Sequence, residues 1–168
     1  MTRKTVLVLG ATGGVGGETA RALLAAGWEV TALTRRASPV SSDIRWVQGD
    51  AMNVEDVRSA AKGASVIVHA VNPPGYRDWE RQVLPMIDNT LVAARHHGAR
   101  VVLPGTIYNY GHDAFPLLRE DSPQHPVTRK GEIRVELEKR MEKAAREGVR
   151  SLILRCGDFF GPRTGNNW

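Results

Sequence analysis

The sequence predicts an α/β fold in which a doubly wound parallel sheet lies between two layers of helices. Two observations lead to this prediction. Short apolar runs alternate with stretches of helical periodicity along the whole chain, which favours parallel strands joined by helices. The apolar runs are rich in Val, Leu and Ile, as expected when both faces of a sheet are covered. Right-handed crossovers then leave an open, doubly wound sheet as the main topology.

Six strands and four helices are expected in alternation. The strands are expected at 4–10, 28–34, 44–48, 65–71, 99–104 and 150–156. The helices are expected at 14–26, 54–62, 78–97 and 129–147. The last helix has the clearest pattern, because Ile133, Leu137 and Met141 share one face while Glu138 is expected on another. The segment 104–128 is rich in loop formers, and a loop of that length inside a compact domain is often functional.

Length and composition indicate one globular domain. The 168 residues include 42% hydrophobic and 24% charged residues, which is ordinary for a soluble protein. No apolar run approaches the length of a membrane span, and only a short apolar run follows the basic start before Gly10. The single cysteine, Cys156, excludes an intrachain disulfide framework. We therefore expect a cytoplasmic protein with no membrane partner.

The formal net charge of +5 does not predict a nucleic-acid partner. The basic residues are mostly scattered arginines, with no dense block of Lys and Arg. Aromatic residues make up 6% of the chain and are dispersed, which does not favour a base-stacking surface. A phosphorylated cofactor explains part of the positive balance more simply.

A glycine-rich turn follows the first expected strand. The run Val6–Leu9 breaks at Gly10, Gly13 and Gly16, and a helical pattern follows. Glycine lets a diphosphate approach the backbone closely, and the next helix directs its first N–H groups at the anion. This arrangement predicts a dinucleotide site, with a purely structural turn as the alternative. The expected cofactor contacts in the turn are Gly10, Thr12, Gly13, Gly14, Val15 and Gly16.

The second expected strand ends in Thr34, Arg35 and Arg36. An acidic residue about twenty positions beyond the glycines normally binds the ribose 2′-hydroxyl of NAD, and none is present here. Two guanidinium groups would pair with a 2′-phosphate, at about 1.5–3 kcal/mol for each charge-assisted bond. NADP is therefore the preferred cofactor, with NAD as the alternative. The structural alternative is that Arg35 and Arg36 belong to a solvated loop and bind no cofactor.

Two further strand ends supply candidate cofactor contacts. Asp50, followed by Ala51, closes the third strand, where its carboxylate could accept from the adenine amino group. Its structural alternative is an N-cap or turn acid before the helix near Val54. Val71 and Asn72 end the fourth strand at the edge where ligands gather, and Asn72 could orient the cofactor.

These motifs together resemble the extended branch of the short-chain dehydrogenase/reductase superfamily, the NAD(P)-dependent epimerases and dehydratases. The Gly-x-x-Gly-x-x-Gly turn and Asp50 match that branch. Thr106–Gly111 resembles its Ser/Thr…Tyr-Gly segment, and Leu154–Pro162 resembles its Arg-x-x-x-x-aromatic-Gly-Pro segment. The resemblance covers essentially the whole chain and implies a Rossmann fold and an NAD(P)-dependent enzyme. The family commonly dimerises through four helices, which would place a homodimer contact on 78–97 and 129–147.

The resemblance implies hydride transfer at a carbinol or carbonyl carbon of a small substrate, possibly similar to a sugar nucleotide. The family uses a Tyr-x-x-x-Lys dyad at the start of the helix near 129. If Lys130 is the family lysine, the tyrosine position holds Pro126; if Glu136 sets the register, the pair is Thr128 and Glu132. Neither register keeps the dyad, and loss of such a general acid costs about 10²–10⁴ in rate unless another group replaces it.

Candidate replacements are Thr106, Tyr108, Tyr110 and Lys130. Thr106 matches the family hydroxyl that contacts the substrate oxygen, and a shifted tyrosine with Lys130 could rebuild the dyad. Lys130 would also hold the cofactor ribose, as the family lysine does. The alternatives are that both tyrosines only pack the loop, and that the chain is an NAD(P)-binding sensor or regulator without turnover.

The remaining residues give weaker signals. Extended members continue beyond Gly-Pro into a substrate lobe, so we expect residues 1–168 to form the NAD(P)-binding domain without that lobe. No metal site is expected, because His96 and His97 lack a third ligand at suitable spacing. Cys156 is expected to be a buried, inert thiol in an apolar strand.

Overall fold

The computed structural model describes residues 4–36, 43–73 and 78–160. Gly161 and Pro162, the last two residues of the segment Leu154–Pro162, lie outside the described residues. The described strands form one six-stranded parallel sheet. They are β1 (Thr5–Leu9), β2 (Glu29–Thr34), β3 (Arg45–Gln48), β4 (Val66–His69), β5 (Arg100–Gly105) and β6 (Ser151–Arg155). Their order is β3-β2-β1-β4-β5-β6, which confirms the doubly wound α/β prediction.

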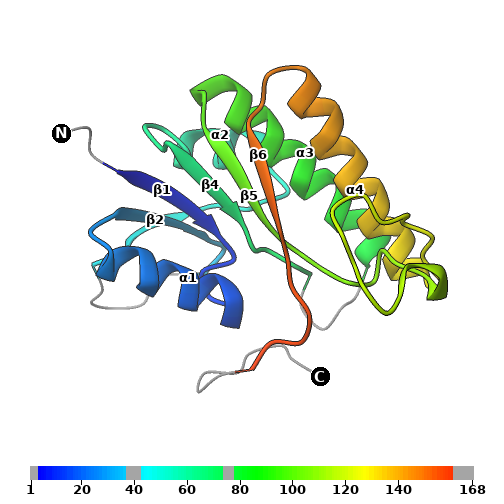
Figure 1. Cartoon of the computed structure of the whole chain (residues 1–168). Coiled ribbons are helices and arrows are strands. Elements are labelled where there is room, and N and C mark those ends of the chain that lie inside the picture. The colour runs from blue at the N-terminus through cyan, green and yellow to red at the C-terminus, as the bar shows by residue number, and fades with distance from the viewer. Residues whose placement is uncertain (1–3, 37–42, 74–77, 161–168) are drawn as a thin grey trace.

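The helices fall on both faces of this sheet (Figure 1). They are α1 (Gly14–Ala25), α2 (Val54–Ala60), α3 (Trp79–His97) and α4 (Arg129–Arg146), with a 3₁₀ helix, η2 (His112–Ala114), between β5 and α4. Each helix and strand expected from the sequence is confirmed, with ends that differ by at most two residues.

Two apolar cores hold the layers together. The larger core joins α2, α3 and α4 to one face of the sheet, with Leu7, Ile67 and Leu103 pointing into it. The smaller core joins α1 to the opposite face through residues such as Val8 and Ala20. Burial of these side chains supplies the main favourable term of folding.

Coverage of the second face is incomplete at the edge strand. Within the described residues, α1 packs against β1 and β2 and no helix reaches β6 on that side. Leu152 and Leu154 therefore remain about half exposed, at 47% and 51%, while Ile153 packs into the larger core. No helix of the described chain is long and apolar enough to cross a membrane.

The strand register aligns the ends that matter for a ligand. Leu9 pairs with Leu33 and with His69, and Gly105 pairs with Arg155. The segments that follow these strands therefore meet along one edge of the sheet. In doubly wound folds, this carboxyl edge is where ligands bind.

Candidate cofactor and substrate site

The glycine turn after β1 is pressed against two backbone segments. Gly10 has φ +87°, and a Cβ built there would lie 2.5 Å from the carbonyl oxygen of Ala70. A Cβ on Gly16 would lie 2.3 Å from the carbonyl oxygen of Gly10. Neither position accepts a side chain without moving backbone atoms. The same packing brings the turn beside the start of the segment 70–73, which contains Val71 and Asn72.

The first turn of α1 presents its backbone to the sheet edge. The N–H of Gly13 donates to the carbonyl oxygen of Gly10 at 2.9 Å, which closes the turn. Gly13 is the N-cap, no side chain caps the helix, and its first turn contains no acidic residue. Thr12 and Gly13 are exposed, while Gly14 and Val15 are half-buried. A bare cradle at the positive end of a helix fits the diphosphate of a dinucleotide.

The end of β2 lies next to the end of β3. The N–H of Gly49 donates to the carbonyl oxygen of Thr34 at 2.9 Å, and the N–H of Arg36 donates to the Thr34 hydroxyl oxygen at 3.3 Å. Thr34 is buried, whereas Arg35 and Arg36 are exposed. No ion pair found within the described ranges includes either guanidinium.

Asp50 is a turn acid rather than the cap of α2. Its carboxylate accepts from the N–H of Met52 at 2.9 Å, and its own N–H donates to Asp56 at 2.8 Å. The side chain of Asn53 caps α2 instead. Asp50 stays half-buried, and Ala51 beside it is buried. The structure therefore excludes the N-cap alternative, while the predicted adenine contact remains a hypothesis.

His69, at the end of β4, is a buried and neutral imidazole. Its Nδ1 lies 2.8 Å from the hydroxyl oxygen of Thr90, and this hydroxyl donates to the carbonyl oxygen of Met86 at 3.0 Å. The Thr90 oxygen must therefore accept, so Nδ1 of His69 is the protonated nitrogen. Burial, assisted by the positive charge of Arg134, lowers the pKa of His69 to about 3.

Two cations on α4 lie over the indole of Trp79. The guanidinium carbon of Arg134 lies 4.9 Å from the ring centroid, and Nζ of Lys130 lies 5.7 Å from it. Arg134 is only 5% exposed, and its Nη2 donates to Oδ1 of Asn72 at 2.9 Å. Lys130 and Arg134 have the four-residue spacing of the family dyad, in a register that the sequence analysis did not consider. This register places Lys130 at the tyrosine position and Arg134 at the lysine position.

The two registers considered from the sequence place structural residues at the dyad. Thr128 is the N-cap of α4, and its hydroxyl oxygen accepts from the N–H of Gly131 at 3.1 Å. Pro126 lies just before the helix, and a Cβ on Gly131 would meet the Cβ of Pro126 at 2.6 Å. The same built atom would lie 2.2 Å from the carbonyl oxygen of Tyr108. The segment after β5 therefore contacts the first turn of α4, one residue from Lys130.

An ion pair between the buried Glu138 and the half-buried Arg155 anchors the polar residues beside this contact. Arg155 donates to Glu138 through Nη1 at 2.6 Å and through Nη2 at 2.8 Å. Burial pulls the pKa of Arg155 down, but its hydrogen bonds with Glu138 and the Glu138 charge outweigh this and raise it. Nη1 of Arg155 also donates to the carbonyl oxygen of Thr106 at 2.8 Å, so the pair fixes the backbone where β5 ends. Glu138 is only 3% exposed, which corrects the expectation that it lies on a different face from the core residues of α4.

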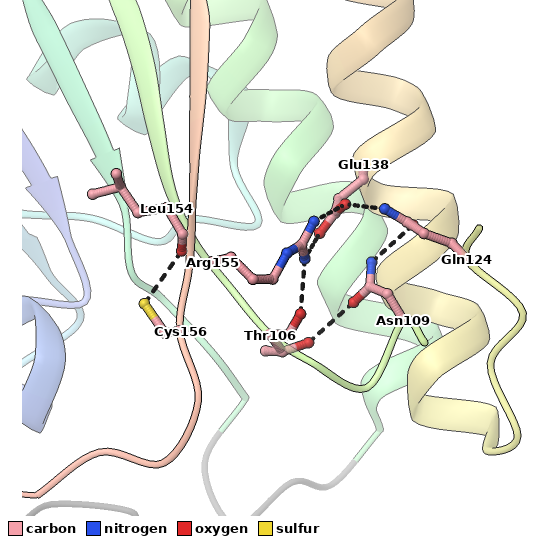
Figure 2. Close-up of polar contacts among 7 residues, drawn as sticks. All are labelled: Thr106, Asn109, Gln124, Glu138, Leu154, Arg155 and Cys156. Carbon is pink, nitrogen blue, oxygen red and sulfur yellow. Dashed lines mark hydrogen bonds and ion pairs between the residues drawn. The ribbon is translucent and has the colours of Figure 1, made fainter. Parts of the chain in front are cut away.

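A chain of side-chain hydrogen bonds runs from this pair to Thr106 (Figure 2). Gln124 joins Glu138 at 2.9 Å, Asn109 joins Gln124 at 3.1 Å, and Thr106 joins Asn109 at 3.1 Å. We call these four side chains the polar chain. Thr106 is half-buried at its outer end, while Asn109 is fully buried.

The two candidate tyrosines lie in different settings. Tyr110 is 6% exposed, and the Arg155 guanidinium lies over its ring at 5.1 Å. Tyr108 is half-buried and follows the end of β5 by three residues. Tyr110 is thus packed inside the protein, whereas Tyr108 lies close to α4.

The structure brings the predicted residues together in two groups. One group consists of the glycine turn, Val71 and Asn72, and it continues toward the ends of β2 and β3. The other group consists of Thr106, Tyr108 and Lys130. Arg134 links the groups through Asn72. Sequence reasoning missed Arg134 and Glu138, although the spacing of Lys130, Arg134 and Glu138 at intervals of four on one helix was a readable signal.

Other residues considered from the sequence lie apart from this edge or lack a reactive setting. Within the described residues no group of three or more His, Cys, Asp or Glu could hold a metal ion. Cys156 follows β6 rather than lying within it, and it is half-buried rather than buried. Burial raises the pKa of its thiol, and the opposing effect of Arg155 is smaller. His125 forms an exposed pair with Asp113 at 2.8 Å.

Comparison with known proteins places the chain in a family. The profile of the NAD dependent epimerase/dehydratase family matches residues 6–167. The chain belongs to this family. This membership confirms the resemblance to extended short-chain dehydrogenases/reductases.

Members of this family include two curated relatives. One is the 3-diazoavenalumate denitrifying reductase of Streptomyces sp, at 32% identity over 95% of this chain and 58% of the relative. Another is the dTDP-6-deoxy-L-talose 4-dehydrogenase (NAD(P)(+)) of Kitasatospora kifunensis, at 29% identity over 93% of this chain and 52% of the relative. The chain thus spans a little more than half the length of these relatives.

A solved structure has the same fold as this chain. The UDP-N-acetylglucosamine 4-epimerase of Bacillus cereus superposes with a TM-score of 0.85 at 20% identity, over 98% of this chain and 57% of that chain. At this identity the match establishes the shared fold of the two proteins.

Proposed function

We propose that the chain binds NADP and belongs to an oxidoreductase or epimerase/dehydratase that transfers hydride at a carbinol or carbonyl carbon of a small substrate. The observation that supports this best is the combination of a bare glycine cradle with two exposed arginines at the end of β2. The cradle suits a diphosphate, and the arginines suit a 2′-phosphate monoester. NAD is the alternative cofactor, because charge alone discriminates between the two by only about one to two orders of magnitude.

In this proposal, different residues of the site bind different parts of the cofactor. The turn from Gly10 to Gly16 holds the diphosphate, Thr34 to Arg36 hold the 2′-phosphate, and Asp50 with Ala51 contacts the adenine. Val71 and Asn72 lie beside the nicotinamide half, with Asn72 held by Arg134. When bound, the nicotinamide ring accepts or supplies the hydride of the reaction.

The chain's own residues near α4 then bind the substrate. Thr106 hydrogen-bonds the reacting oxygen. In the register that makes Lys130 the family lysine, Lys130 holds the ribose of the cofactor. Tyr108 is the better candidate of the two tyrosines for exchanging a proton with that oxygen, because Arg155 covers the ring of Tyr110. The carbonyl contact between Tyr108 and Gly131 supports its proximity to Lys130. A sugar-nucleotide-like substrate and a homodimer through α3 and α4 are further expectations of the family, as is a cytoplasmic location.

A turnover experiment separates this proposal from its alternative. The chain is mixed with NADPH and a panel of aldehydes, ketones and keto sugars, and absorbance of the reduced nicotinamide is followed. The proposal predicts oxidation of NADPH with at least one carbonyl class, abolished by the Lys130→Ala substitution. Tight binding of NADPH with no turnover across the panel favours the second candidate, an NAD(P)-binding sensor or regulator, which the loss of the Tyr-x-x-x-Lys dyad supports.

A further inference from the structure

The polar chain ends on a group that can only accept hydrogen bonds. Glu138 is 3% exposed and receives two N–H groups of Arg155. An ion-paired carboxylate has no hydrogen to donate. The contact with Gln124 must therefore be donated by the Gln124 amide nitrogen, as observed at 2.9 Å.

This fixed end determines the orientation of each group that follows. With its nitrogen toward Glu138, Gln124 turns its Oε1 toward Asn109, which donates through Nδ2. Asn109 then turns its Oδ1 toward the hydroxyl of Thr106. Reversing either amide would set two acceptors or two donors against each other beside the buried Asn109 or Glu138, which is costly. Figure 2 shows the resulting line of contacts from Glu138 to Thr106.

The consequence falls on the Thr106 hydroxyl. A threonine hydroxyl has one hydrogen and two acceptor lone pairs. Its hydrogen is used inside the protein, toward Oδ1 of Asn109 at 3.1 Å. Toward a ligand, Thr106 therefore offers only lone pairs. A hydroxyl oxygen can donate to them, whereas a carbonyl oxygen cannot.

We propose that Glu138, acting through Gln124 and Asn109, holds Thr106 as a hydrogen-bond acceptor, so that the site selects substrates that present a hydroxyl rather than a carbonyl oxygen at this position. This proposal rests on the proposed function, because it takes Thr106 as the residue that meets the substrate oxygen. It assigns the alcohol as the preferred bound form. Glu138, Gln124 and Asn109 are positioning residues.

The orientation of the polar chain can be measured without cofactor or substrate. Neutron diffraction from crystals of the whole chain, exchanged into D₂O, locates the deuterium atoms directly. The proposal predicts the Thr106 deuterium between Oγ1 and Oδ1 of Asn109. A map in which Nδ2 of Asn109 faces Thr106 overturns it. Because this result needs no cofactor, it stands apart from success or failure of the proposed NADP binding.

Three substitutions test the role of each part. Glu138→Leu removes the acceptor that sets the orientation, so the amides of Gln124 and Asn109 are free to turn over and Thr106 loses its imposed direction. Gln124→Met keeps the length of the side chain but cuts the polar chain, so Thr106 has no imposed direction. Glu136→Gln is the matched control, because Glu136 pairs with Arg140 on the outer side of the same helix.

Ligand preference is read from the Thr106 methyl group by NMR of threonine-labelled protein titrated with 2-propanol and with acetone. Wild type and Glu136→Gln are expected to bind 2-propanol about two- to tenfold more tightly than acetone, the contribution of one neutral hydrogen bond. Glu138→Leu and Gln124→Met are both expected to remove the preference. If Glu138→Leu does not fold, Gln124→Met and the wild type still decide the question.

Three results would overturn the proposal. They are equal responses to the two ligands in the wild type, a wild-type preference for acetone, and a Glu138→Leu variant that keeps the wild-type order. Absence of any Thr106 response to 2-propanol also overturns it, since Thr106 then faces no ligand. If instead the preference appears but no nicotinamide cofactor binds, the proposed function fails while the orientation of Thr106 stands.

Discussion

The two halves of the sheet satisfy their polar groups in different ways. In the half formed by β1 to β3, the polar side chains at the carboxyl edge bond to their own neighbours in sequence. Asp50 accepts from Met52, and Asn53 caps the helix that it precedes. In the half formed by β4 to β6, partners come from distant segments. Glu138 pairs with Arg155, and Arg134 donates to Asn72 across 62 positions.

This difference has an energetic consequence. Local contacts at an exposed edge are worth little and are easily replaced by water. Long-range contacts of buried groups are costly to break, because the partner is left in a medium of low dielectric. In the first half, exposed arginines are therefore available to bind a ligand. In the second half, the polar groups hydrogen-bond to one another. The following predictions test the contrast, beginning with the largest effect.

Glu138→Leu is expected to lower the free energy of unfolding by about 2–3 kcal/mol, because the half-buried guanidinium of Arg155 loses two charge-assisted hydrogen bonds. Glu136→Leu, two positions away, removes only a half-exposed pair with Arg140 and is expected to cost less than about 1 kcal/mol. Urea unfolding of both variants measures the contrast. Similar losses for the two variants would show that the Glu138–Arg155 pair contributes no more to the free energy of unfolding than the Glu136–Arg140 pair.

Replacing Arg35 and Arg36 together by serine is expected to weaken NADPH binding by about 10- to 100-fold. This corresponds to a loss of about 1.4–2.8 kcal/mol of binding free energy. NADH binding is expected to change little. Arg45→Ser is the control, because Arg45 is exposed at the opposite end of β3. Fluorescence titration of the reduced nicotinamide gives both constants. An equal loss for NADPH and NADH would mean that the arginines do not bind the 2′-phosphate.

Acid is expected to destabilise the fold through His69. Its pKa in the folded chain is about 3, below the usual 6.5. Between these two values His69 binds a proton in the unfolded chain but not in the folded chain. This contribution is complete above pH 6.5 and is lost as the pH falls toward 3, at no more than about 1.4 kcal/mol for each pH unit. Between pH 6.5 and 5 the loss reaches about 2 kcal/mol.

His69→Asn removes this titration while keeping a donor for Thr90. Its unfolding free energy, measured in urea at pH 7, 6 and 5, is expected to fall less steeply than that of the wild type. Parallel slopes would contradict the assignment of a neutral buried imidazole.

Asn53→Ala has the smallest expected effect, about 1 kcal/mol of unfolding free energy, because it removes only the cap of a short helix. Asn53→Asp keeps the acceptor and is expected to retain most of the stability. A loss in Asn53→Ala as large as that in Glu138→Leu would erase the contrast between the two halves.

The same contrast explains what the sequence could predict. Strand positions, the glycine turn and Thr34 to Arg36 are signalled by neighbouring residues, and the structure has these elements where the sequence indicates them. The end of β2 could be recognised because exposed residues there depend little on distant segments.

The second half could not be derived in this way. Glu138 looks like a surface residue of α4 until β6 places Arg155 beside it. Arg134 looks like one more scattered arginine until Trp79 and Asn72 surround it. The spacing of Thr128 and Pro126 could be considered from the sequence, whereas the face that α4 buries is set by its packing against α3 and β6.

The account depends most directly on preferential binding of the phosphorylated dinucleotide at the first half of the sheet. Isothermal titration of the wild-type chain with NADPH and with NADH, in the same buffer and at the same ionic strength, measures this. We predict binding of both, with NADPH tighter by about tenfold or more. Equal affinities, tighter binding of NADH, or no heat with either dinucleotide would contradict it.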